Sequence, residues 1–343
     1  MSGARPYSGP YDDRYKVNSG DIVLATRQQS DNLPILAMPA MVPDSLQGKD
    51  IVIGTNLYKV EITDTTFSNV YIYWLLKTKQ YVNYIAGVKT GTTVSMVTKK
   101  NVEDFTFFAP SNPKEREEIA SILSSLDDKI AVNKKICENL EAQAQALFKH
   151  WFVDFAPFKD GKFVESELGL IPEGWRVGRL GEVADITSGK RPPKKSKELN
   201  NECNIPLIGA ADIMGYTSSI LYKSPILIIG RVGTHGVVQR WKDACWPSDN
   251  TLVIESQYYN FTYQQLKNID YSSINRGSTQ PLITQTDVKN TSIIIPTRQT
   301  LEKYESIINI LYDSIYRNNK ESARLATLRD TLLPKLMSGE IKI

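Results

Sequence analysis

The stretch GTTVSMVTKKNVEDFTFFAP at residues 91–110 decides the fold, because it returns as GSTQPLITQTDVKNTSIIIP at residues 277–296. The leading glycine, a threonine (Thr98 and Thr284) and the closing proline coincide at a constant offset of 186 residues. A repeat of this length exceeds the units of about 20 to 50 residues that build solenoid proteins. The sequence therefore predicts two copies of a whole domain.

A long helical pattern follows each copy, and here the offset falls to 185 residues, which one deletion explains. The first helix is expected to open at Asn112-Pro113, since asparagine caps a helix and proline suits its first turn. Apolar residues then recur at alternating steps of three and four, the heptad pattern of a coiled coil. The predicted seam consists of Leu126, Ile130, Asn133, Leu140 and Leu147 in the first helix and Leu311, Ile315, Asn318, Leu325 and Leu332 in the second.

These stripes predict that the two helices, each about 55 to 60 Å long at the usual rise per residue, pack against each other in antiparallel directions. One asparagine in each seam, Asn133 and Asn318, would set the register of the pair at some cost in stability. Burial of each stripe within its own domain is the alternative.

Each copy is expected to be a mixed α+β domain, because short β-rich segments bounded by Gly, Asn and Pro surround one amphipathic helix. The first copy has predicted strands at 21–25, 50–53, 57–62 and 105–108 and a helix at 70–85. The second has predicted strands at 225–230, 251–255 and 292–296 and a helix at 259–269. The predicted fold is thus two α+β domains separated by two long antiparallel helices, with pseudo-two-fold symmetry and boundaries at 1–111, 112–156, 157–297 and 298–343.

The composition is that of a globular protein, with 41% hydrophobic and 23% charged residues. The sequence shows neither an apolar signal segment at its start nor a run of about 18 apolar residues, so we expect a cytoplasmic protein. Cys137, Cys203 and Cys245 stand apart from one another and predict reduced, buried thiols rather than disulfides or a zinc site. The net charge of +3 permits nucleic-acid binding.

The residues that most enzymes need are scarce. His150 and His235 are the two histidines, and the phosphate loop, the dinucleotide fingerprint and the zinc helix motif are all missing from the sequence. A methyltransferase tetrapeptide of the Asn/Asp-Pro-Pro-aromatic type is missing as well. A hydrolase or nuclease that uses carboxylates such as Asp249 remains one alternative, and a scaffold that binds only proteins is another.

The positive evidence favours DNA binding. A basic loop follows Gly189, and arginines stand among glycines in Gly230–Gly236 and Asn275–Gln280, where the backbone can approach a ligand and Arg can bind guanine or phosphate. The first copy offers Arg27-Gln28-Gln29 and Lys89–Thr92 at the corresponding places. The predicted DNA contacts are Lys190, Arg191, Lys194, Lys195, Arg231, Thr234, His235, Arg276, Ser278 and Gln280 in the second copy and Arg27, Lys89 and Thr92 in the first.

Four segments closely resemble the specificity subunit of type I restriction-modification systems: Glu115–Ala120 with Leu126–Ile130, Phe148–Phe155, Gly169–Trp175 with Leu180–Glu182, and Leu332–Ile341. The resemblance implies a non-catalytic DNA reader without a metal or cofactor of its own. Each domain would read one half of a split site, and the helices would set the distance between the halves. Two methyltransferase subunits that use S-adenosylmethionine, and a motor-nuclease subunit that uses ATP and Mg²⁺, would be the protein partners.

The first copy departs from the family pattern in one respect. The second copy has Gly174-Trp175, Leu180–Glu182 and Thr187–Lys190 well before its strand at 226–229, whereas the first copy begins about twenty residues before the equivalent strand. The opening segment of the first domain is therefore missing from the pattern. A truncated or rearranged specificity subunit, with one working half, is the alternative that this difference raises.

Overall fold

The computed structural model describes residues 5–29, 35–91, 93–232, 236–276 and 282–343. The chain divides into two compact units, 1–135 with 318–343, and 136–317, and the two long helices contribute to both. They are α4 (Pro113–Phe152) and α7 (Arg298–Met337), each of 40 residues. No helix of the described residues carries an apolar stretch that could cross a bilayer.

The first unit contains a small β-rich domain, whose central sheet has the strand order β4-β2-β6. Its strands are β1 (Lys16–Val17), β2 (Ile22–Ala25), β3 (Arg27–Gln28), β4 (Pro39–Met41), β5 (Ile51–Val52), β6 (Leu57–Val60) and β7 (Ser95–Met96). Its helices are α1 (Asn69–Leu75), α2 (Lys79–Val88) and α3 (Lys99–Glu103).

The second unit contains a larger β-rich domain, whose central sheet has the order β11-β17-β14-β15. Its strands are β8 (Phe163–Ser166), β9 (Gly169–Pro172), β10 (Arg176–Arg179), β11 (Asp185–Ser188), β12 (Ile205–Ile208), β13 (Ile213–Thr217), β14 (Ile226–Gly230), β15 (Val238–Trp241), β16 (Trp246–Pro247), β17 (Thr251–Glu255) and β18 (Ser292–Ile295). Its helices are α5 (Tyr259–Lys267) and α6 (Gln285–Lys289).

The two central sheets repeat one another residue by residue. β2 pairs with β6 through Ile22↔Val60 and Leu24↔Tyr58, and β14 pairs with β17 through Leu227↔Ile254 and Ile229↔Leu252. The alternating inward side chains, Ile22 and Leu24 in one sheet and Leu227 and Ile229 in the other, are fully buried. α3 and α6 repeat as well, since each begins with a capping box, formed by Thr98 with Asn101 and by Thr284 with Asp287. The predicted internal repeat is confirmed.

The prediction of one helix over 70–85 was wrong. The Thr78 hydroxyl accepts a hydrogen bond from the Tyr81 N–H and caps a new helix, so two helices, α1 and α2, replace one. Val82, which lies within the predicted amphipathic helix, is exposed. The predicted strand at 105–108 was also wrong, since no described strand pairs with this segment.

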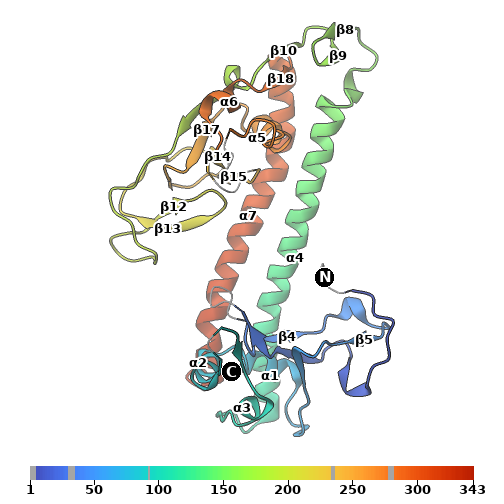
Figure 1. The fold of residues 1–343 in the computed structure, drawn as a ribbon, viewed down its shortest axis with the longest axis vertical. Helices are drawn as coiled ribbons and strands as arrows, with labels where there is room; N and C mark the ends of the chain where they lie inside the picture. Colours follow the sequence, from blue (N-terminus) through green and yellow to red (C-terminus); the bar gives the residue numbers. More distant parts are fainter. Residues whose placement is uncertain (1–4, 30–34, 92, 233–235, 277–281) are drawn as a thin grey trace. The chain divides into compact units, whose positions relative to one another are not determined.

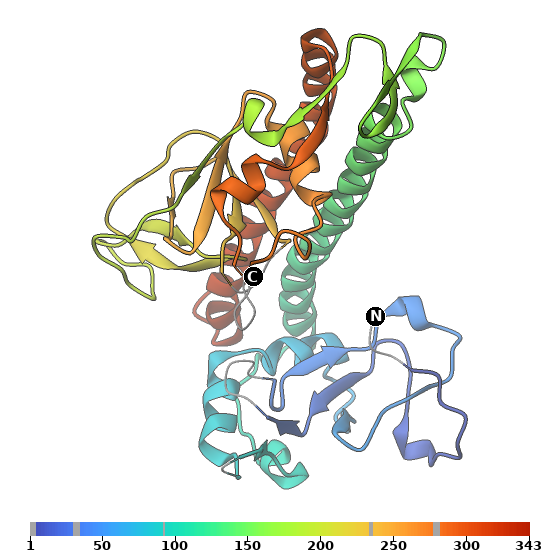
Figure 2. The same ribbon diagram turned by 45° about the horizontal axis from the view of Figure 1, so that its top comes forward.

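α4 and α7 lie side by side in both ribbon views (Figures 1 and 2). In the first unit Asp127 binds Arg329, and Asn133 Nδ2 donates to Glu321 Oε2 at 2.8 Å. As the residue number increases along α4 it decreases along the facing part of α7, so the two helices run in opposite directions. In the second unit the Cys137 thiol donates to the Ile315 carbonyl at 3.7 Å. The predicted antiparallel packing is therefore confirmed. Of the ten predicted seam residues Asn133 is fully buried and the other nine are half-buried.

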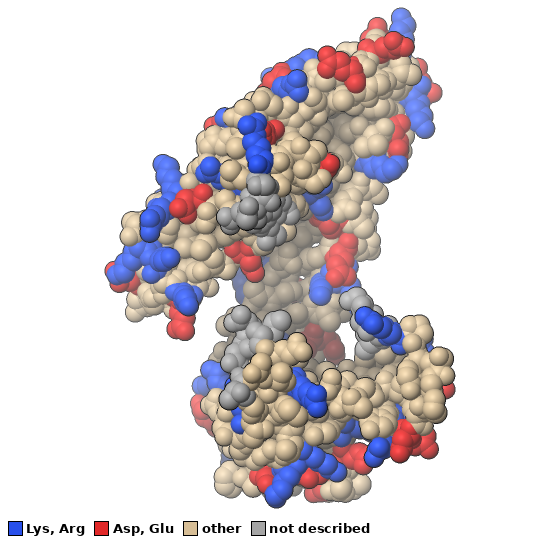
Figure 3. Space-filling model, viewed as in Figure 1, with Lys and Arg blue, Asp and Glu red and all other residues tan. Residues whose placement is uncertain are grey.

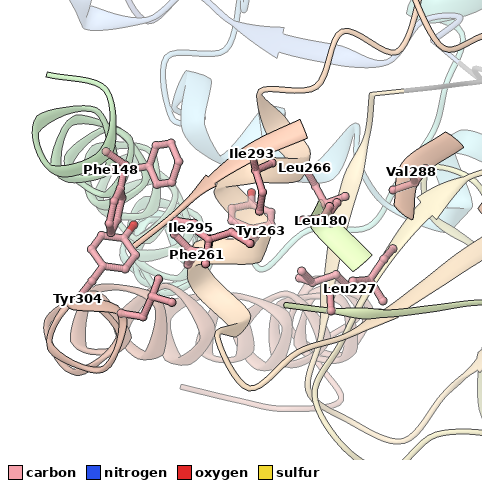
Figure 4. Packing of buried hydrophobic residues seen from close by; sticks show 14 of the residues in the cluster. Phe148, Leu180, Leu227, Phe261, Tyr263, Leu266, Val288, Ile293, Ile295 and Tyr304 are labelled. Carbon is pink, nitrogen blue, oxygen red and sulfur yellow. The ribbon is translucent and has the colours of Figure 1, made fainter. Parts of the chain in front are cut away.

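Each domain is fixed to the helices by a three-helix junction built at repeated positions. In the second unit Phe148 and Phe152 of α4 pack against Tyr304 of α7 and Phe261 of α5 (Figure 4). In the first unit the equivalent positions hold Leu333 and Met337 of α7 and Ile119 of α4, and they pack against Tyr71 and Trp74 of α1. Residues that lie 185 positions apart thus pack in equivalent junctions, although the helix residues are aromatic in one junction and non-aromatic in the other.

Asn133 is predicted to cost stability. Its side chain has no exposed surface and its Oδ1 lacks a hydrogen-bond partner among the described residues. We expect Asn133→Leu to raise the free energy of unfolding by about 1 kcal/mol, since an unsatisfied buried polar atom is exchanged for apolar contact. Urea unfolding measures the change, and Asn139→Leu at an exposed position of the same helix is the control. A destabilised Asn133→Leu variant would contradict the assignment.

Candidate nucleic-acid interface

Three strand termini of the second domain meet at one edge of its central sheet. β17 is antiparallel to both β11 and β14, so the start of β17 lies beside the ends of the other two. The Gly189 N–H donates to the Thr251 carbonyl at 3.0 Å, and the Arg231 N–H donates to the Asn250 carbonyl at 2.9 Å. The predicted basic loop and the predicted Arg231 therefore leave the sheet at the same edge.

Gly189 is required at the start of the basic loop. A Cβ atom there would lie 2.2 Å from the Ser248 carbonyl oxygen and 2.6 Å from that of Pro247, closer than any side chain tolerates. The next residue, Lys190, donates its N–H to the Pro247 carbonyl and accepts from the Trp246 indole at 2.7 Å. The backbone of Lys190 is thus held on both sides while its side chain is exposed.

The loop that precedes α6 joins the same edge. The Ile283 N–H donates to the Arg231 carbonyl, and the Arg276 N–H donates to the Leu282 carbonyl, both at 3.0 Å. Gln285 Nε2 then donates to Ser188 Oγ at 2.8 Å, which ties the start of α6 to the end of β11. Four segments that are distant in sequence thereby converge.

The cations of the basic loop and of the loop that precedes α6 differ in how far nearby acidic residues already neutralise them. Lys194 binds Glu202, and the Arg276 guanidinium binds Asp287, whereas Lys190, Arg191 and Lys195 are exposed. Although partial burial opposes it, hydrogen bonds from Thr284 and Arg276 hold the pKa of Asp287 below its usual value. Arg276 consequently binds the capping box of α6, and because Asp287 already neutralises its charge, it would attract a phosphate less strongly.

On the face drawn in Figure 3, basic side chains are interspersed with acidic ones. This distribution agrees with the small net charge of +3, and the charges on this face form no broad basic field.

The first domain has the same edge with different residues. The Thr26 N–H donates to Asn56 and the Val97 N–H donates to the Thr26 carbonyl, as Arg231 is bonded to Asn250 and Ile283. Thr26 is therefore the counterpart of Arg231, and Arg27, which pairs with Met96, corresponds to Val232. Arg27 thus lies one position further along the equivalent loop than Arg231 does.

Arg27 and Lys89 are both exposed. Arg27 pairs with Met96, and Thr90, the neighbour of Lys89, pairs with Met96 as well, so the two cations belong to the same small sheet region. Gln28 is buried and its Oε1 accepts from the Ile35 and Leu36 N–H groups, so it orders the backbone. The predicted contacts Thr92, Thr234, His235, Ser278 and Gln280 lie outside the described residues.

Sequence reasoning missed Thr26, Ser188 and Gln285 as members of this edge. The 186-residue offset, which takes Val97 to Ile283, points to the segment at the start of α6 that holds Gln285, but it does not extend to Thr26 or Ser188. His150 lies exposed on α4, and Asp249 is exposed beside Asn250. Within the described ranges no group of His, Cys, Asp and Glu is placed to hold a metal ion.

The comparisons with known proteins agree with this geometry. The model of the type I restriction modification DNA specificity domain matches residues 8–142 and 172–326. The MjaIX specificity subunit of Methanocaldococcus jannaschii is 31% identical over 80% of this chain and 69% of its own length. The HindI specificity subunit of Haemophilus influenzae is 24% identical over 84% of this chain and 81% of its own length.

The crystal structure of a type I restriction-modification S subunit from M. genitalium shares the fold, with a TM-score of 0.62 and 17% identity over 95% of this chain and 84% of that one. Two copies of the family's domain, each followed by a long helix, account for most of the described structure. The chain therefore belongs to the specificity subunits of type I restriction-modification systems, which recognise DNA and are not themselves catalytic.

Proposed function

We propose that this chain reads a bipartite DNA site, one half with each domain, and does so in the cytoplasm. The observation that carries the proposal is the set of loops at the strand ends of each domain, where Arg231 lies in one domain and Arg27 in the other. Such strand-end loops can reach base edges and phosphates, whereas the sheet behind them stays rigid.

The paired helices act as the ruler in this proposal. In this proposal the recognition segments are 1–111 and 157–297, and the helical segments 112–156 and 298–343 contain α4 and α7. The packing of the two helices and the repeated junction near the start of each helix would hold each recognition domain firmly on its helical segment.

We further propose that two methyltransferase subunits, which bring S-adenosylmethionine, bind this scaffold, and that a motor-nuclease subunit, which uses ATP and Mg²⁺, joins the complex. The repeated junctions support two equivalent docking regions. The test is transfer of labelled methyl groups to a defined bipartite DNA by the chain and its methyltransferase together. Nuclease activity of the chain alone with Mg²⁺, or assembly without any DNA binding, would contradict the proposal.

Lys195 is expected to contact a phosphate. Its side chain is exposed and unpaired within the described structure, whereas the neighbouring Lys194 is bound to Glu202. Lys195→Ala should lower the slope of log K against log salt by about 1, while weakening specific and nonspecific DNA alike.

Lys194→Ala is the matched control for this measurement, because it removes a charge that Glu202 already neutralises. The control is expected to change the slope less. Equal slopes for the wild type and Lys195→Ala over a titration of the salt concentration would remove Lys195 from the interface.

A further inference from the structure

The segment Thr106–Ala109 of the first domain is the counterpart of β18 in the second. The 186-residue offset takes it onto Ser292–Ile295, and exposed and half-buried side chains alternate along it as they do in a strand. β18 pairs with β10 in antiparallel register, with Ile294 opposite Val177. No backbone hydrogen bond, by contrast, joins the peptide groups of Thr106–Ala109 to any residue of the described ranges.

Phe108 is exposed where the first domain has no strand equivalent to β10 in the described structure. Its side chain is 92% exposed, whereas its counterpart Ile294 is half-buried against the core of the second domain. Phe105 and Phe107 on the opposite face stack on each other with ring centroids 6.0 Å apart, and Phe105 packs on Tyr81. The segment is thus anchored through the side chains of one face and leaves the apolar Phe108 exposed on the other, while its backbone groups stay unpaired in the described structure.

A second edge is open in the same domain. β17 pairs with β14 on one side and with β11 on the other, but its counterpart β6 pairs only with β2 in the described structure. Thr251–Ile254 of β17 are fully buried, while all four residues of β6 are half-buried. Unpaired edges of this kind readily accept an added strand.

In the second domain one continuous segment, Arg176–Ser188, covers both places. Its first strand pairs with β18, its second pairs with β17, and the buried Leu180 between them donates its N–H to the Thr291 carbonyl at 2.9 Å. The Arg179 guanidinium donates to the Ser292 hydroxyl, and the first domain keeps a hydroxyl at the equivalent Thr106.

We propose that the first domain has a binding site for one extended polypeptide segment with the pattern of Arg176–Ser188, an alternating strand, a Leu-Gly-Glu turn and a second strand. The first strand of this ligand pairs with Thr106–Ala109 and covers Phe108, and its second strand pairs with β6. Backbone hydrogen bonds supply the affinity, and the buried leucine and isoleucine positions supply the specificity. The inference rests on the internal repeat and is independent of DNA reading.

The test uses a fluorescent peptide with the sequence of residues 173–190, EGWRVGRLGEVADITSGK, and the full chain. Fluorescence anisotropy should show saturable binding at one site. The same peptide with Asp at the positions of Leu180 and Ile186 should bind at least tenfold more weakly. Hydrogen exchange of the complex should slow at Thr106–Ala109 and at β6.

Phe108→Asp in the chain locates the site. Because Phe108 is exposed, the variant should unfold at the same temperature as the wild type but bind the peptide at least tenfold more weakly. Ile310→Asp, which charges another exposed apolar residue on α7, should leave the affinity unchanged. Peptide binding that survives Phe108→Asp, which would indicate exchange into the second domain, overturns the proposal. So does the absence of binding at millimolar peptide.

Discussion

Glu305→Ala is expected to destabilise the second unit by roughly 3–5 kcal/mol, because the substitution removes one partner from a buried charged network. Glu305 of α7 is 9% exposed. Its Oε1 accepts from the Asn260 and Phe261 N–H groups at 2.9 and 2.8 Å, and its Oε2 accepts from Asn260 Nδ2 at 2.7 Å. Alanine would leave the Asn260 and Phe261 N–H groups without an acceptor at the buried start of α5, whereas Asn260 Nδ2 would keep its hydrogen bond to Asn309 Oδ1.

The network reaches the sheet through Arg240 of β15. Its guanidinium lies 3.5 Å from the centroid of the Tyr312 ring and donates to Asn260 Oδ1 at 2.5 Å. α5, β15 and α7 are therefore joined by one set of polar contacts, and losing Glu305 should loosen the recognition domain from its helix as well as lower stability.

Urea unfolding of the full chain followed by circular dichroism measures the loss. Glu302→Ala is the matched control, since Glu302 lies on the same helix but forms an exposed pair with Arg298. We expect the control to change stability by about 0.5 kcal/mol or less. Equal unfolding midpoints for the two variants would show that the Glu305 network contributes little.

Glu305 also predicts a pH dependence. Burial raises the pKa of its carboxyl, and the hydrogen bonds from Phe261 and Asn260 only partly offset this effect. Because its pKa is raised in the folded state, the folded protein binds a proton at Glu305 more tightly than the unfolded chain does. The resulting contribution to stability is complete below the unfolded pKa of about 4.3 and is lost as the pH rises through the folded-state pKa. The stability of the wild type relative to Glu305→Gln should therefore fall as the pH increases above about 4. A constant difference between pH 4 and 8 would contradict the direction.

Arg231→Ala is expected to weaken specific DNA binding by about 1–3 kcal/mol, which is the discrimination of one good arginine contact to a base. Its backbone is fixed on both sides, by Asn250 and Ile283, while its guanidinium has no partner among the described residues. A guanidinium that extends from a fixed backbone at a strand end, and that has no partner among the described residues, is available to a guanine or to a phosphate.

Competition binding at constant salt distinguishes the two roles. A base contact predicts that Arg231→Ala loses affinity for the specific site more than for nonspecific DNA, and that Arg231→Lys does not restore it. Arg298→Ala, at the start of α7, is the control for the loss of one positive charge. Unchanged specific binding by Arg231→Ala at matched salt would remove Arg231 from the reading surface.

The repeat predicted the architecture because packing positions recur along it. Ile119 and Tyr304 differ in chemistry but share an offset of 185, and both are buried in equivalent junctions. The seam and the start of α4 follow from local rules, since Asn112 Oδ1 accepts from the Lys114 N–H as a helix cap should.

The errors have local physical causes. The sequence at 70–85 has helical spacing throughout, but Thr78 provides a competing cap that divides it. The residues at 105–108 have strand character, yet a strand also needs a partner, and pairing is not visible in a single segment. Arg276 is a different case: it stays a predicted DNA contact, and only the structure shows that Asp287 binds its guanidinium.

The central claim, that two domains read separate halves of one site at a distance set by the paired helices, is tested most directly by methylome sequencing. Cells that express the chain with its methyltransferase partner should carry modified adenines in one bipartite motif with a fixed, unread spacer. The modification should vanish without the chain, and Arg231→Ala should relax one half of the motif only. A continuous motif, or a methylome that does not depend on the chain, would contradict the claim.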